Sequence, residues 1–292
     1  MDTRILDWNW LGKAIRLAAD ARGNGPKVLL LPALSSISSR REMHPLQERL
    51  AARYSTFAVD WPGFGEAPRP QLDWTPDAYA AFLAFVLNSV MPHPHAIIAA
   101  GHAATYVLKH AASAPGLTAR LVLVAPTWRG PLPTMAGGHS PFFDRLCRLV
   151  DRATVGPLIY RLNVNPFVVR RMGAGHVYSD PAFLDQERLR QKLAVVRADG
   201  ARFASARFVT GRLDPLASRE AFLDVARRAG APILLVYGAD TPPKSRAEME
   251  ALAAVSGVRA ARLPRGKLSV HEEFPDTTLS AIEPFLAEGS AA

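Results

Sequence analysis

The sequence contains a single cysteine, Cys147, among 292 residues. One cysteine cannot form an internal disulfide, so we expect a reducing compartment, with a cytoplasmic location as the default. No stretch of the sequence approaches the roughly 20 apolar residues that a membrane-spanning helix requires. Charged and aromatic residues interrupt positions 1–10, so we expect neither a secretory signal nor a targeting peptide.

Sequence signatures of metals, cofactors and nucleic acids are also lacking. His93, His95 and His110 cluster only in the sequence, without acidic partners at a metal-ligand spacing. Aromatic residues are not interleaved with the basic ones, and no nucleic-acid-binding motif occurs. We therefore expect no cofactor, no metal and no nucleic-acid partner.

Positive charge is plentiful and unevenly placed. The net charge is +9, and residues 129–228 hold 17 Lys and Arg against 9 Asp and Glu, a balance of +8. Such a field attracts an anionic ligand, an acidic protein or a membrane surface. An arginine-rich surface that only keeps the protein in solution is the alternative.

Short apolar runs alternate with helical patterns along much of the chain. The apolar runs, typical of strands buried on both faces of a sheet, are 27–31, 56–59, 96–100, 121–125 and 233–237. The helical patterns are 41–53, 78–90, 103–112 and 245–254. The alternation predicts an α/β fold with a doubly wound, mostly parallel sheet, to which residues 4–21 add an antiparallel edge.

The alternation breaks over 129–229, which is rich in Pro and Gly at its start and then helical and basic. This predicts a helical cap inserted between two parts of the core, 1–128 and 230–292. Apolar residues of 142–153 recur at helical spacing, with arginines at 145, 148 and 152 on the other side. This amphipathic helix either closes over the core or touches lipid or an apolar substrate.

Two small-residue segments carry a family resemblance. Residues 95–105 read as a strand, a tight turn and a helix, and the small side chains of Gly101, Ala103 and Ala104 suit a sharp turn. About 40 residues earlier, 59–66 read V-D-W-P-G-F-G-E, with glycines that permit another tight turn. The two segments resemble the α/β-hydrolase superfamily, in which D-x-P-G-x-G-x-S precedes the nucleophile elbow G-x-S-x-G.

The resemblance implies an α/β-hydrolase fold with a degenerate catalytic triad. It places Ala103 at the nucleophile position and Lys267 at the histidine position of the loop 263–275. Thr241 stands at the acid position after the strand 232–238, with Asp240 one residue away. His271 is the other candidate base, with Asp240 to orient it, or it only holds its loop in place.

The resemblance also implies a ligand site at the carboxyl end of the sheet. Five residues are expected to line it: Leu34, Ser35, His102, Ala104 and Trp128. Backbone N–H groups near Leu34 and Ala104 are expected to stabilise an oxyanion, and the His102 side chain to point away from the turn. Asp60 is expected to bind backbone donors of its own turn, and Asp214 to cap a helix.

Ser-His-Asp chemistry requires a hydroxyl group, and Ala103 has none. Two classes of function therefore stay open. The first is an enzyme that acts on a small apolar ester, lipid or carbonyl compound without a serine nucleophile, by water activation or lyase-type proton transfer. The second is a non-catalytic relative that binds a hydrophobic anionic ligand or another protein.

Overall fold

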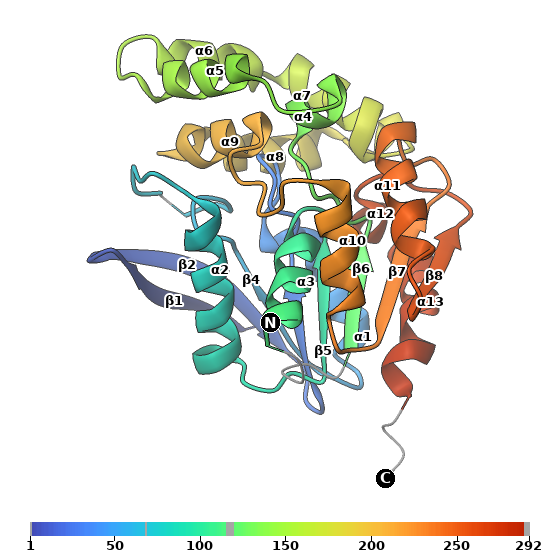
Figure 1. Ribbon diagram of the computed structural model, residues 1–292. Helices are drawn as coiled ribbons and strands as arrows, with labels where there is room; N and C mark the ends of the chain where they lie inside the picture. The colour runs from blue at the N-terminus through green and yellow to red at the C-terminus, as the bar shows by residue number, and fades with distance from the viewer. Residues whose placement is uncertain (1, 68, 115–119, 289–292) are drawn as a thin grey trace.

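The computed structural model describes residues 2–67, 69–114 and 120–288 (Figure 1). Its eight-stranded sheet has the order β1-β2-β4-β3-β5-β6-β7-β8. The pairs β1–β2 and β2–β4 are antiparallel, and all other neighbouring strands are parallel. The mostly parallel sheet and its antiparallel edge are therefore confirmed.

Strands and helices alternate as the apolar runs predicted. The strands are β1 (Asp2–Trp10), β2 (Lys13–Arg22), β3 (Lys27–Leu31), β4 (Ser55–Val59), β5 (Ala96–Ala100), β6 (Arg120–Val124), β7 (Ile233–Gly238) and β8 (Val258–Leu263). The helices of the core are α1 (His44–Leu50), α2 (Pro76–Phe85), α3 (Ala103–Ser113), α10 (Arg219–Arg227), α11 (Pro243–Ala253), α12 (Val270–Glu273) and α13 (Pro275–Ala287). Between β6 and α10 lie α4 (Pro131–Ala136), α5 (Pro141–Asp151), α6 (Gly156–Asn163), α7 (Pro166–Met172), α8 (Gln186–Arg197) and α9 (Ala201–Thr210). Short 3-10 or π segments are η1 (Arg40–Met43), η2 (Val86–Val90), η3 (Gly173–Val177) and η4 (Pro181–Phe183).

The central strands are apolar because helices cover both faces of the sheet. Leu29 and Leu30 are neighbours in β3, and their side chains join cores on opposite faces, as the two-residue period of a strand requires. One core packs against α2, α3, α10 and α11, and the other against α1 and α13. The sheet is thus the middle of three layers, and its carboxyl edge is the place where loops from several strands meet.

Helices α4–α9 lie over that carboxyl edge (Figure 1). In α5 the buried side chains of Cys147 and Val150 pack against Ala206 of α9, so its apolar face closes inward. Helix α10 lies within the predicted cap segment, but it packs against α3 beside the sheet. Asp214 does not cap this helix, because Ser218 accepts the N–H of Ala221 at its first turn.

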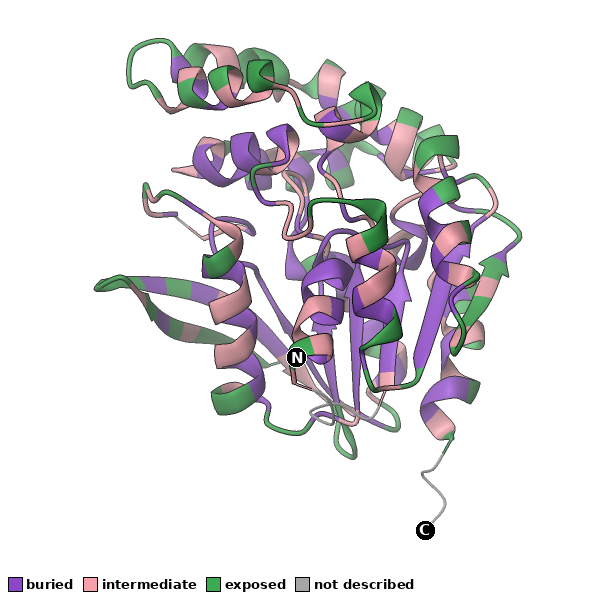
Figure 2. Ribbon diagram, viewed as in Figure 1, coloured by how far each residue is buried: buried purple, intermediate pink, exposed green. Residues whose placement is uncertain are grey.

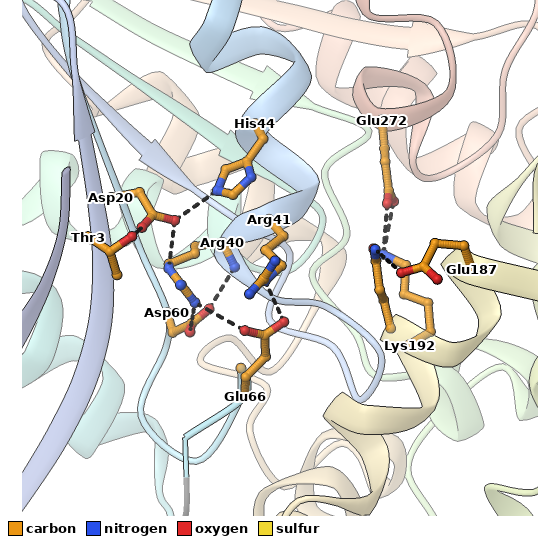
Figure 3. A network of polar contacts seen from close by, with 12 residues as sticks. Thr3, Asp20, Arg40, Arg41, His44, Asp60, Glu66, Glu187, Lys192 and Glu272 are labelled. Atoms are coloured by element: carbon orange, nitrogen blue, oxygen red, sulfur yellow. Dashed lines mark hydrogen bonds and ion pairs between the residues drawn. The ribbon is translucent and has the colours of Figure 1, made fainter. Parts of the chain in front are cut away.

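Asp60, in the turn after β4, is buried and binds outside its own turn. Its carboxylate accepts the backbone N–H of Arg40 at 2.6 Å and the guanidinium Nη1 of Arg40 at 3.0 Å (Figure 3). Arg40 also approaches Asp20 at 2.7 Å. A side chain at residue 65 would collide with the Asp60 carboxyl group, and Gly65 has a φ of +80°. The glycine is therefore needed for space as well as for its backbone angle.

Among the described residues, no helix combines the length and the apolar character needed to cross a bilayer. The same part of the chain contains no group of three or more His, Cys, Asp and Glu side chains arranged to hold a metal ion.

Candidate functional site

The turn between β5 and α3 is formed by Gly101. Its φ is +52°, in the left-handed region that side chains disfavour, and α3 begins two residues later. A Cβ at Gly101 would lie 3.1 Å from the Cβ of Ala33, in the loop after β3. This strand, sharp turn and helix are the geometry in which a nucleophile elbow exposes its central side chain.

Ala103 does not lie at the turn, which corrects the sequence-based assignment by two residues. Ala103 is the first residue of α3, and it is fully buried in the core between the sheet and the helices. A signal for Gly101 was present in the sequence. Small residues stand at 99, 101 and 103, and Gly101 is the central one, directly after the apolar run.

The loop after β3 is held by a buried carboxylate. Oε1 of Glu42, in η1, accepts the backbone N–H of Ala33 at 2.6 Å, and Leu34 beside it is fully buried. Burial alone would raise the pKa of Glu42, but the neighbouring His271 imidazole and the charge of Lys192 outweigh it and lower that pKa. Glu42 is therefore ionised at neutral pH. Its segment resembles an ordinary charged helix in the sequence, so nothing there predicted a buried anion.

The backbone N–H groups that were expected to stabilise an oxyanion are hydrogen-bonded to acceptors within the protein. The Ala104 N–H donates to the Gly101 carbonyl at 3.3 Å, inside the first turn of α3. The Ala33 N–H next to Leu34 donates to Glu42. Ser35 accepts the N–H of Ser38 through its own carbonyl at 3.1 Å. These contacts hold the loop and the turn in place.

His271 lies on α12 and is completely buried. Its Nε2 lies 3.5 Å from Oε1 of Glu42, which makes Glu42 its acidic neighbour. Asp240 is exposed at the end of β7 and accepts the N–H of Gly266 at 3.0 Å. That hydrogen bond is the main reason why the pKa of Asp240 is lowered. The structure therefore pairs Asp240 with the loop after β8 and pairs His271 with η1.

Lys267 connects the core to the cap. Its Nζ donates to the Ala174 carbonyl in η3 at 2.5 Å. The backbone N–H groups of Leu268 and Ser269 donate to the carbonyls of His176 at 3.4 Å and Val177 at 3.1 Å. Residues 267–269 of the loop after β8 are thus hydrogen-bonded to the cap segment.

A salt bridge also joins these two parts of the molecule. Nζ of Lys192 in α8 lies 2.9 Å from Oε1 of Glu272 in α12 (Figure 3). The Tyr178 hydroxyl donates to Oε2 of Glu272 at 2.7 Å. Burial lowers the pKa of Lys192, but the charge of Glu272 more than reverses this and raises it above its usual range.

His102 follows the turn, and its side chain points into the protein. Its Nε2 donates to the Leu213 carbonyl at 3.1 Å and lies 3.4 Å from Oδ1 of Asp214. Oδ1 of Asp214 also accepts the N–H of Gly130 at 2.8 Å, and Oδ2 lies 3.2 Å from Nε2 of His139. Burial lowers the pKa of His102 to about 4 and raises that of Asp214 to about 8. Both groups are therefore neutral at pH 7, although they are an acid and a base in contact.

Nδ1 of His102 is buried and has no hydrogen-bond partner within the described residues. A buried polar atom without a partner costs free energy, about 1–3 kcal/mol, so it is a feature that a ligand or a bound water would relieve.

Trp128 is buried beside the sheet edge and donates Nε1 to Oε2 of Glu248 at 2.9 Å. Arg129 stacks over its ring at 4.5 Å. The cavity beside Trp128 measures about 10 Å³, which is room for about one water molecule and no organic ligand. Trp128 therefore has a packing role in this conformation.

Comparison with known proteins places these features in context. The sequence model described as the alpha/beta hydrolase family matches residues 28–281. A 2-(acetamidomethylene)succinate hydrolase from Mesorhizobium japonicum is 26% identical over 288 residues, which cover 93% of this chain and 92% of that protein.

Solved structures share the fold at lower identity. A haloalkane dehalogenase from Agrobacterium tumefaciens matches with a TM-score of 0.74 and 16% identity, covering 98% of this chain and 97% of the other. A thermophilic esterase from Thermogutta terrifontis matches with a TM-score of 0.72 and 18% identity, covering 98% of both chains. At these identities the structures show the fold alone.

Proposed function

The chain belongs to the alpha/beta hydrolase family, and from that premise we propose that it is a member without serine-type acyl transfer, which serves as a module that binds a small apolar or anionic ligand or another protein. The observation that carries the proposal is the identity of the turn residue. Gly101 occupies the left-handed turn between β5 and α3, where a family member with serine chemistry exposes its nucleophile. A glycine there supplies no hydroxyl to form an acyl-enzyme.

Electrostatics around the turn support the same proposal. The Glu42 carboxylate binds the N–H of Ala33, the residue whose Cβ lies 3.1 Å from the Cβ position of Gly101. Oxyanion stabilisation needs donors that are free and directed at the developing negative charge. A buried, ionised carboxylate on the neighbouring N–H opposes that charge instead.

The positions of the other catalytic groups add support. Lys267 is bonded to the cap, His271 is buried against Glu42, and Asp240 binds the loop after β8. General acid–base catalysis requires a base within hydrogen-bond reach of the reacting atom. Here Lys267 and Asp240 are engaged in hydrogen bonds, whereas His271 lies 3.5 Å from Glu42 with neither ring nitrogen hydrogen-bonded among the described residues.

One observation favours a second function, an enzyme without a serine nucleophile. His102 directly follows the turn residue, and its buried Nδ1 has no hydrogen-bond partner in the part of the chain that the structure describes. An unprotonated imidazole nitrogen is able to activate a water molecule or take a proton from a carbonyl compound. The tests below separate this function from the binding function.

A fluorophosphonate probe and an ester panel, from short to long acyl chains, test the proposal on the unmodified protein. We expect no covalent labelling and no hydrolysis above the uncatalysed rate. In Gly101→Ser, activity should rise by less than about tenfold, because a hydroxyl without an imidazole base lacks most of the triad's rate. Ala103→Ser is the matched control, with its hydroxyl in the core.

Labelling of the unmodified protein, or strong hydrolysis by Gly101→Ser, would refute the proposal. Ester hydrolysis that is lost in His102→Gln, but kept in His271→Ala and Lys267→Ala, would establish the second function and identify its base.

A further inference from the structure

The outer helices of the cap expose large apolar side chains to solvent. Phe142 in α5, Leu158 and Leu162 in α6 and Phe167 in α7 are each 62–73% exposed. In Figures 1 and 2, α5 and α6 form the layer of the molecule farthest from the sheet, with much of their surface exposed. Large exposed apolar groups concentrated in three consecutive helices mark an interaction site more often than single scattered ones do.

Three of the four exposed apolar residues are followed by arginine one helical turn later. Arg145 follows Phe142, Arg161 follows Leu158, and Arg170 follows Phe167, all at a spacing of three residues. Residues three apart lie on the same helix face, so Phe142, which is exposed, lies on the arginine side of α5 and not on the inward apolar face that its spacing predicted. The outer surface of α5–α7 therefore combines apolar and cationic groups on each helix; we call it the outer cap surface.

The positive charge of this surface is not neutralised from within. Residues 141–172 contain six arginines and two aspartates. Asp144 pairs with Arg212 and Asp151 with Arg207, which are both outside this segment. Within the described chain, none of the six arginines lies within ion-pair distance of a carboxylate: Arg145, Arg148, Arg152, Arg161, Arg170 and Arg171. An external anion would therefore meet unpaired guanidinium groups.

A basic groove continues the surface. It measures about 340 Å³ and lies between α7 and α8, with an apolar floor that includes Leu189 and Leu193. Arg170, Arg190 and Arg197 border it. Arg170 thus belongs to both the groove and the face that carries Phe167. An apolar floor with arginines at its rim suits an amphiphile that has an anionic head group.

We propose that the outer cap surface docks on a bilayer of anionic phospholipid, with Phe142, Leu158, Leu162 and Phe167 entering the headgroup region and the arginines contacting lipid phosphates. An interfacial helix layer needs both groups, because apolar burial and attraction to anionic lipid add to each other. The proposal is independent of chemistry at Gly101, since no residue of the outer cap surface belongs to the turn. Its failure would leave the proposed function untouched.

Cosedimentation of the full chain with vesicles tests the proposal. One vesicle is phosphatidylcholine alone, and the other contains about one third phosphatidylglycerol. We expect binding to the anionic vesicle at low ionic strength, loss of most of this binding at high ionic strength, and little binding to phosphatidylcholine alone. Absence of binding to anionic vesicles at low ionic strength overturns the proposal, as does equal binding to both vesicles.

Two pairs of variants locate the surface. Arg161→Gln/Arg170→Gln should weaken binding roughly thirtyfold, since two cations near the surface are removed. Arg53→Gln/Arg262→Gln removes the same charge from exposed sites outside the cap and should change binding less than twofold. Equal effects of the two pairs would overturn the assignment to the outer cap surface.

The apolar contribution has its own control. Leu158→Ser/Phe167→Ser should reduce binding at least about tenfold, whereas Ile5→Ser/Leu11→Ser, at exposed positions of the β1–β2 hairpin, should leave it unchanged. Unaltered thermal unfolding of each variant shows that it is folded. If the apolar cap variant binds as well as its control, the surface does not enter a bilayer and the proposal fails.

Discussion

The turn after β5 requires a backbone angle that only glycine adopts without strain. Gly101 has a φ of +52°, and the space beside it is limited by Ala33. In a family whose turn residue is normally a nucleophile, a side chain is held in this strained angle for catalysis. Here the same turn is made without that strain, so the position is free to serve stability.

Replacing Gly101 by alanine should destabilise the protein for two reasons. The left-handed angle costs about 1–2 kcal/mol with a side chain, and the new Cβ would press on Ala33 at 3.1 Å. Chemical denaturation gives the free energy of unfolding. Gly137→Ala is the control, because Gly137 has a φ of +83° with nothing within 4 Å of its Cβ position. Equal losses in the two variants would show that contact with Ala33 adds nothing.

At the scale of elements, Asp214 joins three segments that are distant in the sequence. It contacts His102 before α3, Gly130 before α4 and His139 before α5. Asp214 itself lies in the stretch of chain that leads into α10. A carboxyl group buried at such a junction stabilises the fold best in its neutral form.

This arrangement predicts that stability falls as the pH rises. The folded pKa of Asp214 is about 8, above its usual value, so between about pH 4 and pH 8 the folded state binds more protons than the unfolded state. Asp214 makes its full contribution to the free energy of unfolding below about pH 4. Between about pH 4 and pH 8 this contribution decreases by up to about 1.4 kcal/mol per pH unit.

Asp214→Asn should therefore gain stability relative to the unmodified protein as the pH rises from 5 to 8. Denaturation of both proteins at several pH values measures the difference, with Asp224→Asn, on the surface of α10, as the control. A difference that is constant across this range, or that changes in the opposite direction, would contradict the assignment of Asp214 as a buried, protonated acid.

At the scale of the whole molecule, cap and core are joined by polar contacts around the loop after β8. Lys267 donates to the Ala174 carbonyl, and Lys192 pairs with the Glu272 carboxylate. Cys147 lies within the cap and is buried between α5 and α9. Burial also raises the pKa of its thiol, so its reaction with a thiol reagent reports loosening of the cap helices α5 and α9 from each other.

Lys192→Met should loosen the cap. The variant leaves Glu272 partly buried without its cation, which costs about 3 kcal/mol. We expect faster labelling of Cys147 and a lower free energy of unfolding. Lys192→Met/Glu272→Leu should recover much of the loss, because neither charge then remains buried. If the single and double variants label at the same rate, the ion pair does not hold the cap.

Much of the fold followed from the sequence. Apolar runs of five residues and the helical patterns between them located β3, β5, β6, β7 and most core helices, because a strand covered on both faces has to be apolar throughout. The division of the chain at 129–229 stays a prediction. Within that segment α4–α9 lie above the sheet and α10 packs against α3 (Figure 1). The helical pattern of α10 does not reveal which neighbour it packs on.

Local sequence patterns were enough to predict the strand, turn and helix around 95–105, the glycines of the turn after β4 and the basic character of residues 129–228, because each depends on local backbone angles, periodicity or charge. Packing of the chain was needed to show that Glu42 binds Ala33, and that His271 faces Glu42 while Asp240 faces Gly266. These contacts join residues far apart in the chain, and their strength comes from burial, which removes water from charged groups. Burial is a property of the packed molecule, so spacing along the chain does not contain it.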